Sequence, residues 1–174
     1  MKTHKCLLAL ALVMLSTVSF AGEKPRYFIH ANGYGPVKIG MTEAQASRAL
    51  GKIVAPEDPK DENFFSCHDA FIKGETNVPS FMVEEGGIIT RVDVYDGPTC
   101  TDKGIRIGST EKEVYKKYGK KVKSRPHFYL RDSGKYLIVP TSKNHEILFE
   151  TDRGKVINFR VGKLPSVEYV EGCE

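Results

Sequence analysis

Three adjacent residues, Cys67, His68 and Asp69, bring a thiol, an imidazole and a carboxylate into one short stretch. These residue types act together in enzymes that use an activated cysteine nucleophile. The surrounding residues, FFSCHDAFI, are typical of a β-strand. Because adjacent side chains of a strand point to opposite faces, Cys67 and His68 are not expected to meet. The sequence therefore favours a structural Cys67, and a hydrolase built on His68 and Asp69 is only a third hypothesis for the function.

Two further motifs resemble known catalytic or phosphate-binding patterns and fail at a decisive position. HEILFE begins like a zinc-protease motif, but Phe149 stands where the second histidine is needed, and the segment is typical of a strand. GPVKIGMT has glycines at the spacing of a phosphate loop but no lysine before Thr42. The sequence therefore predicts a protein that is not an enzyme and has no metal or cofactor.

The first 21 residues have the pattern of a secretory signal peptide. Lys2 and Lys5 precede the apolar run CLLALALVMLSTV, and Ser19-Phe20-Ala21 is a cleavage site of the small-x-small type. We expect cleavage near Ala21 and export; a retained N-terminal anchor is the alternative. Removing Lys2 and Lys5 lowers the formal net charge from +4 to +2, and this balance, together with export, argues against a nucleic-acid partner.

Cys67, Cys100 and Cys173 remain after this cleavage. An oxidising compartment favours one disulfide, and the main candidates are Cys67–Cys173 and Cys67–Cys100. We favour Cys67–Cys173, because a bond close to the C-terminus would hold a tail that otherwise frays. The third cysteine would then be buried or would pair between chains.

A stretch of sequence that the chain contains twice predicts two of the elements that must position these residues. KIGMTEAQASRALG, residues 38–51, matches RIGSTEKEVYKKYG, residues 106–119. Each copy has a capping box, Thr42 with Gln45 and Thr110 with Glu113, and ends at a glycine. Each copy predicts a capped helix of about two turns with one buried face. The buried face is expected to carry Ala46, Ala49 and Leu50 in the first helix, and Val114, Tyr118 and also Tyr115 in the second.

Each predicted helix is followed by strand-like sequence that ends in a hairpin. The turns are expected at residues 85–87 and 152–154, and Pro140 should end the strand KYLIVP. Residues 54–63, VAPEDPKDEN, are expected to form an exposed connector. The predicted fold is α+β: two tandem helix-plus-antiparallel-sheet repeats, residues 22–100 and 101–174, form one compact domain. Their strands make one continuous or packed sheet with the short helices on one face.

The phrase IGMTEAQASRALG, with its echo IGSTEKEVYKKYG, resembles a motif of exported bacterial proteins, the β-lactamase inhibitor protein and the BamE (SmpA/OmlA) outer-membrane assembly lipoproteins. The resemblance implies a short capped helix that leads into an antiparallel sheet, and tandem copies whose concave sheet face grips a partner protein. Ser109 replaces the Met of the first copy, and the lipoprotein cysteine is missing. No partner-contacting residue of the inhibitor is carried over, because those residues lie outside the motif.

Two clusters of side chains are candidates for the surface that contacts a partner. A basic cluster is interpreted as a solvated helix face, with contact to an acidic protein, anionic lipid headgroups or cell-wall polymer as the alternative; it comprises Lys116, Lys117, Lys120, Lys121, Lys123 and Arg125. An aromatic cluster is either sheet core or, where exposed, an anchor for a partner; it comprises His127, Phe128, Tyr129 and Tyr136. The partner-binding candidates are Lys116, Lys120, Phe128, Tyr129 and Tyr136.

These observations together predict an exported protein-binding module of the bacterial periplasm or the medium. It would act as an inhibitor, an immunity factor or an envelope-assembly accessory, with another envelope or secreted protein as its partner and without stable membrane insertion. The alternative is a binder of a small ligand or cell-wall polymer that uses a pocket between helix and sheet.

Overall fold

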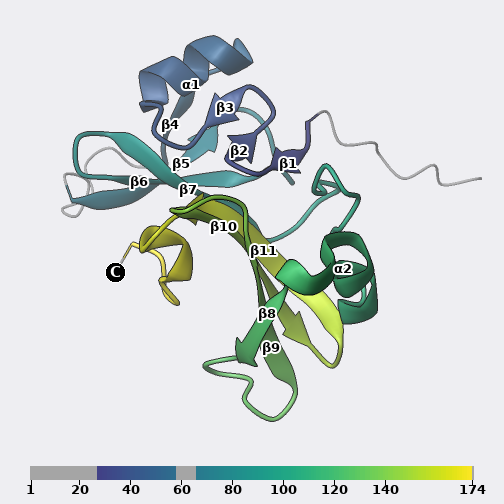
Figure 1. Cartoon of the computed structure of the whole chain (residues 1–174). Helices are drawn as coiled ribbons and strands as arrows, with labels where there is room; N and C mark the ends of the chain where they lie inside the picture. Colours follow the sequence, from purple (N-terminus) through teal and green to yellow (C-terminus); the bar gives the residue numbers. More distant parts are fainter. Residues whose placement is uncertain (1–26, 58–65, 174) are drawn as a thin grey trace, which may run out of the picture.

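The computed structural model describes residues 27–57 and 66–173. It is an α+β structure in which an eight-stranded antiparallel sheet and a three-stranded sheet are combined with two short α-helices (Figure 1). The predicted signal peptide and residues 58–63 of the predicted connector lie outside the described residues.

The elements follow one another in an order that is similar in the two halves of the chain. In the first half they are β1 (Ile29–His30), β2 (Gly33–Tyr34), β3 (Val37–Lys38), α1 (Glu43–Leu50), β4 (Val54–Pro56), β5 (Cys67–Ile72), β6 (Ser80–Glu84) and β7 (Ile88–Val94). In the second half they are α2 (Glu111–Tyr118), the 3₁₀ turn η1 (Gly119–Lys121), β8 (Lys123–Pro126), β9 (Gly134–Pro140), β10 (His145–Asp152), β11 (Lys155–Lys163) and the 3₁₀ turn η2 (Ser166–Glu168).

The large sheet has the strand order β4-β5-β6-β7-β11-β10-β9-β8, so the strands of the two halves lie side by side rather than interleaved. The halves meet where β7 and β11 pair antiparallel, with Val92 opposite Val161. The expected turns are confirmed: residues 85–87 connect β6 to β7, and β10 ends at Asp152 before the turn into β11. Pro140 ends β9, as the sequence predicts.

Both helices begin with the predicted capping box. Thr42 Oγ1 accepts from the Gln45 amide at 3.2 Å while the Gln45 side chain accepts from the Thr42 amide at 2.8 Å. The corresponding distances for Thr110 and Glu113 are 3.2 and 2.7 Å. Gly51 then ends α1 in the left-handed conformation, with φ 67°, which an L-side chain rarely adopts.

The buried helix faces are narrower than expected. Ala46 and Leu50 of α1 are buried, but Ala49 is exposed, so its prediction was wrong. In α2, Val114 and Tyr118 are buried, whereas the Tyr115 side chain is 40% exposed. The reason is that a helix of eight residues touches the sheet through one i, i+4 stripe, which leaves side chains beside that stripe at the rim.

Two further predictions were also wrong, one about the connector and one about the basic segment. The expected connector begins with a strand: Val54 of β4 is buried and pairs with Ile72, because its apolar side chain completes the sheet edge. The basic segment is not one helix face, because α2 ends at Tyr118 and residues 123–126 continue as the edge strand β8.

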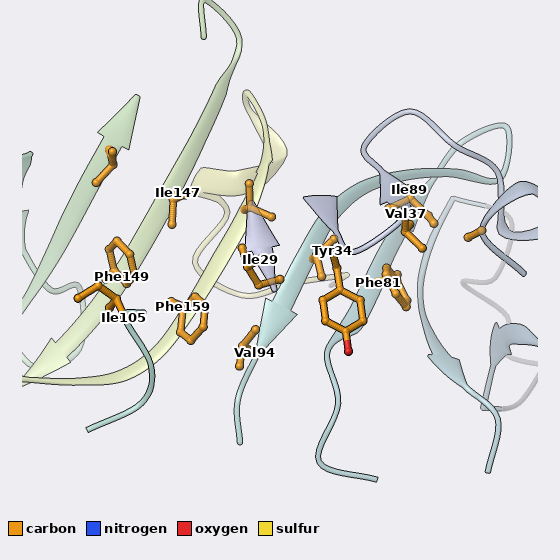
Figure 2. Packing of buried hydrophobic residues seen from close by; sticks show 14 of the residues in the cluster. Ile29, Tyr34, Val37, Phe81, Ile89, Val94, Ile105, Ile147, Phe149 and Phe159 are labelled. Atoms are coloured by element: carbon orange, nitrogen blue, oxygen red, sulfur yellow. The ribbon is translucent and has the colours of Figure 1, made fainter. Parts of the chain in front are cut away.

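Among the described residues, the larger hydrophobic cluster draws side chains from both halves. Figure 2 shows its side chains in a row that passes from Phe149 and Phe159, through Val94 and Ile29, to Phe81. The cluster also contains the buried side chains of both helices, so α1 and α2 cover the same face of the large sheet. Sharing one interior lets two small halves bury more apolar surface than either could bury alone.

Candidate functional site

The opposite face of the large sheet, here called the helix-free face, carries charged side chains at its centre. Asp93 of β7 stands directly opposite Arg160 of β11, and both are buried. Strand alternation puts these side chains on the face away from their neighbours Val92 and Phe159, which belong to the core. A C-terminal segment, residues 164–173, covers part of this face (Figure 1).

Arg91 of β7 fastens the C-terminal segment to the sheet. Its Nε donates to Asp93 Oδ2 at 2.8 Å, and its Nη1 donates to the carbonyls of Ser166 and Tyr169 at 3.2 and 3.1 Å. Burial would lower the pKa of Arg91, but the charge of Asp93 raises it above its usual value. A permanently charged guanidinium therefore holds the backbone of the segment.

Arg160 has the same role one strand further along. Its Nε donates to the Val167 carbonyl at 2.7 Å, its Nη2 donates to the Tyr169 carbonyl at 3.2 Å, and its Nη1 forms a salt bridge with Glu150. Val167 itself is fully buried beside Leu148 in a small second cluster. The donors of both arginines are thus occupied by groups of the chain itself.

Glu150 connects this arginine to the loop between β8 and β9. Its carboxylate accepts hydrogen bonds from Arg160 and, at 3.1 Å, from Asn158 Nδ2. One carboxylate oxygen also lies 3.0 Å from His127 Nε2. Burial alone would raise the pKa of Glu150, but the Arg160 charge and these hydrogen bonds hold it below its usual value. Glu150 is therefore an ionised structural anchor rather than a proton donor.

His127 fixes the loop through its other ring nitrogen. Nδ1 accepts the amides of Tyr129 and Leu130 at 3.1 and 3.2 Å. A nitrogen that accepts two N–H groups carries no proton, so the proton of the neutral ring is on Nε2 and is donated to Glu150. Both ring nitrogens are committed, and His127 is not available as a free general base.

Residues 127–133, here called the aromatic loop, present two large rings to solvent. The Phe128 and Tyr129 side chains are 54% and 62% exposed, and their rings contact each other edge to face with centroids 4.9 Å apart. Tyr136 is only 2% exposed, and its ring stacks on the His127 ring with centroids 4.5 Å apart. Its hydroxyl oxygen accepts a hydrogen bond from the Phe128 amide. Of the three predicted aromatic contact residues, Tyr136 therefore supports the loop from below instead of facing a partner.

Two clefts flank the aromatic loop on the helix-free face. One, of about 400 Å³, has the exposed Tyr95 and Tyr129 among its walls, with Asp69, Asn158 and residues 170–173. Partial burial of the Asp69 carboxylate and the charge of Asp93 raise the pKa of Asp69. The other, of about 570 Å³, has the guanidinium groups of Arg125 and Arg131, the rings of Phe128 and Tyr136 and the carboxylate of Glu168 among its walls.

The disulfide Cys67–Cys173 is confirmed and joins β5 to the end of the C-terminal segment. Cys100 is a buried free thiol, and burial raises its pKa. His68 points to the other side of the sheet, where its Nε2 lies 3.3 Å from Glu43 of α1. The strand therefore separates Cys67 and Asp69 from His68, as its alternation predicts, and no catalytic pair forms among them.

Lys116 and Lys120, the two basic partner-binding candidates, do not join the aromatic loop. They precede β8 in α2 and η1, whereas the loop follows β8 at its other end, and a strand of four residues is about 13 Å long. The structure thus divides the predicted contact residues into two separate surfaces.

The buried charges that hold the helix-free face together were not predicted from the sequence. In IITRVDVY, Arg91 and Asp93 alternate with apolar residues, and Arg160 lies between two apolar residues in NFRVG. This alternation places the charges on the face opposite the core, which is usually exposed to solvent, and their burial depends on the C-terminal segment that covers that face. Within residues 27–57 and 66–173, no cluster of acidic, cysteine and histidine side chains could hold a metal ion.

No protein-family model matches the chain, and no curated protein matches it. Two solved structures are similar to it. The uncharacterized protein YfeY from Escherichia coli has a TM-score of 0.50 and 16% identity, over 78% of this chain and 99% of that one. The DUF4309 family protein YjgB from Bacillus subtilis has a TM-score of 0.45 and 15% identity, over 70% and 78% of the two chains.

At this identity the likeness to YfeY concerns the fold alone. The resemblance to the β-lactamase inhibitor protein and to the BamE lipoproteins stays a prediction. In the part of the chain that the structure describes, neither helix is long and apolar enough to cross a bilayer.

Proposed function

We propose that the protein is an exported, non-enzymatic protein-binding module that uses the aromatic loop on its helix-free face. The observation that carries the proposal is the exposure of Phe128 and Tyr129 on a loop that buried groups hold in one conformation. Aromatic side chains and arginine dominate the binding energy of protein interfaces. A loop that is already ordered loses little conformational entropy when a partner binds.

Charge supports a partner segment with acidic side chains. Arg131 lies over the Phe128 ring with its Cζ 6.0 Å from the centroid, and Arg125 lies over Tyr136 at 5.1 Å. Both guanidinium groups line the cleft of about 570 Å³. A carboxylate that enters this cleft would meet two guanidinium groups beside the exposed Phe128 ring, and it would compete with Glu168, which lies 3.5 Å from Arg125.

The two copies of the repeated sequence, residues 38–51 and 106–119, make equivalent contacts with the large sheet. Gly40 donates its amide to Ile89 at 2.8 Å, and Gly108 donates its amide to Val156 at the same distance. Thr42 and Thr110 also form equivalent bridges, to Ile88 and Lys155. These matched contacts support two tandem copies of one module, which together provide a sheet wide enough for a protein partner.

Site-specific photo-crosslinking tests this function. A benzophenone side chain at position 129 should give a discrete adduct with another protein of the compartment into which the chain is exported. The same group at Ile53, which is 66% exposed and follows α1, is the control and should give none. Adducts that form equally at both positions, or at Ile53 alone, would contradict the proposal.

A second candidate function is the binding of a polar small ligand or a cell-wall polymer. It is favoured by the cleft of about 400 Å³, which combines the rings of Tyr95 and Tyr129 with the polar groups of Asp69 and Asn158. A ligand at one hundred times its Kd would stabilise the fold by about 2.7 kcal/mol. Thermal unfolding with soluble cell-wall fragments decides between the candidates: this one requires a rise in Tm that the substitution Tyr95→Ala abolishes.

A further inference from the structure

The positive charge of the protein is concentrated in one segment, residues 103–125, here called the basic corner. It contains nine basic and two acidic residues, whereas the whole chain has 26 basic and 22 acidic ones. The remainder of the chain therefore carries a slight excess of acidic residues. An asymmetry of this kind produces a local positive potential although the net charge is small.

In the basic corner, which the structure describes in full, neither acidic residue forms a salt bridge with a lysine of the corner, although hydrogen bonds of the capping box and then the charges of Lys116 and Lys117 lower the pKa of Glu113. Glu111 accepts from Lys135 Nζ at 2.9 Å and from Thr151 Oγ1 at 2.8 Å, and Glu113 is occupied by the capping box of Thr110. Among the described residues, five exposed lysines of α2 and η1 form no ion pair: Lys112, Lys116, Lys117, Lys120 and Lys121.

The composition of the basic corner indicates what kind of anion it fits. Seven of its nine cations are lysines, and Arg125, one of its two arginines, lies 3.5 Å from Glu168. Lysines are flexible point charges, whereas discrete phosphates and nucleic acids are recognised by arginine forks and stacked aromatic rings. Neither cleft beside the aromatic loop is lined by α2 or η1. The five lysines therefore match a diffuse negative surface.

An exposed ring among these lysines distinguishes between diffuse surfaces. Tyr115 is 40% exposed on α2, one turn from Lys112 and next to Lys116. Tyr is enriched at the headgroup level of membranes, where its ring is partly buried and its hydroxyl stays hydrated. Lysine stems likewise lie along apolar surface while their ammonium groups reach the headgroups.

We propose that the basic corner docks the protein peripherally on anionic lipid headgroups through the lysines of α2 and η1. Each lysine near such a surface strengthens binding about fivefold. Because α2 covers the face of the sheet opposite the helix-free face, this docking leaves the aromatic loop open to a protein partner. The inference is independent of the proposed function, since the lysines of α2 and η1 take no part in that function.

Vesicle co-sedimentation tests the inference with one charge-reversal pair and one matched control. The test variant is Lys120→Glu with Lys121→Glu; the control, Lys38→Glu with Lys143→Glu, makes the same change of net charge at exposed lysines elsewhere. Wild type and control should bind phosphatidylcholine vesicles that contain phosphatidylglycerol. The test variant should bind them at least tenfold more weakly, and added salt should weaken the binding of all three.

Four outcomes would overturn the inference. The first two are that both charge-reversal variants lose binding equally, or that wild type binds vesicles of pure phosphatidylcholine. The third is that wild type binds a single-stranded oligonucleotide but not the vesicles. The fourth is that inorganic phosphate displaces wild type from the vesicles at constant ionic strength, which would indicate a discrete phosphate site. The variant Phe128→Ala with Tyr129→Ala should sediment with the vesicles like wild type. Loss of its vesicle binding would assign the docking to the aromatic loop and so contradict the basic corner, whatever becomes of the protein partner.

Discussion

His127 and Glu150 form a buried pair, Nε2 to Oε2 at 3.0 Å, that connects the aromatic loop to the centre of the large sheet. On the loop side the imidazole accepts two backbone amides, and on the sheet side the carboxylate is held by Arg160. The backbone that carries the two exposed rings is therefore held by buried groups. Two predictions about stability and loop order rest on this pair, and two more rest on the helix caps and on the disulfide.

Replacing His127 should release the aromatic loop without unfolding the sheet. His127→Phe keeps a ring of similar size but leaves two amides without an acceptor and removes one of the three donors to Glu150, which should cost about 1–3 kcal/mol. Amide exchange at Tyr129 and Leu130 should accelerate in this variant. His127→Asn, whose Oδ1 can accept the amides, should restore part of their protection, and a nitrogen NMR spectrum of wild type showing the proton on Nδ1 would refute the arrangement.

Glu150 should make the protein sensitive to acid. Its pKa is below the usual value in the folded state, so ionised Glu150 stabilises the fold above its unfolded pKa, and this stabilisation is lost as the pH falls through the folded pKa. Glu150→Gln should destabilise the protein by about 3–5 kcal/mol at neutral pH, because Arg160 then keeps a buried, unpaired charge. Urea unfolding at pH 7 and at pH 3 should show a smaller difference for the variant than for wild type. An equal pH dependence would speak against Glu150 as the anchor.

The two helix caps should contribute equally. Thr42→Ala and Thr110→Ala each remove an acceptor for an N-terminal amide, and each should lower the free energy of unfolding by about 1 kcal/mol. Because the caps lie in different halves, the double variant should lose the sum of the two. Chemical denaturation of the three variants measures this, with Ser109→Ala as a neighbouring control outside the capping box. A strongly unequal pair of effects would mean that the two halves depend on their helices to different extents.

The disulfide should stabilise the fold mainly by restricting the unfolded chain. It closes a loop of 106 residues, for which the chain-entropy model gives about 4–5 kcal/mol. Cys173→Ser should lower the unfolding free energy by no more than this amount and should increase proteolysis of residues 170–173. In Cys67→Ser the loss should be similar, because both variants open the same loop. Cys100→Ser, at a buried free thiol, is the control and should leave the C-terminal segment protected.

Much of the fold follows from local patterns in the sequence. The capping boxes at Thr42 and Thr110, the glycine turns and Pro140 are determined by neighbouring residues, and they are placed correctly. The disulfide was chosen correctly from two alternatives by the argument that it secures the tail. The edge strand β4 was missed, because its three residues form a strand only by pairing with β5, which is distant in sequence.

The candidate site was harder to predict, because it depends on contacts between distant segments. Phe128 and Tyr129 were recognised as candidate anchors, but nothing local distinguishes them from the buried Tyr136. Arg91 and Arg160 acquire their role only when the C-terminal segment folds over them, about 75 and 7 residues further along the chain. Periodicity in a strand identifies which face a residue occupies, but it does not identify what covers that face.

The central claim is that Phe128 and Tyr129 are the hot spot of a protein interface. Its most direct test is a calorimetric titration of the crosslinked partner, once purified, into wild type, Phe128→Ala, Tyr129→Ala and the control Ile53→Ala. We predict that each loop substitution raises Kd about thirtyfold, the effect of about 2 kcal/mol, and that Ile53→Ala leaves it unchanged. An unchanged Kd in both loop variants, with the fold intact, would contradict the account.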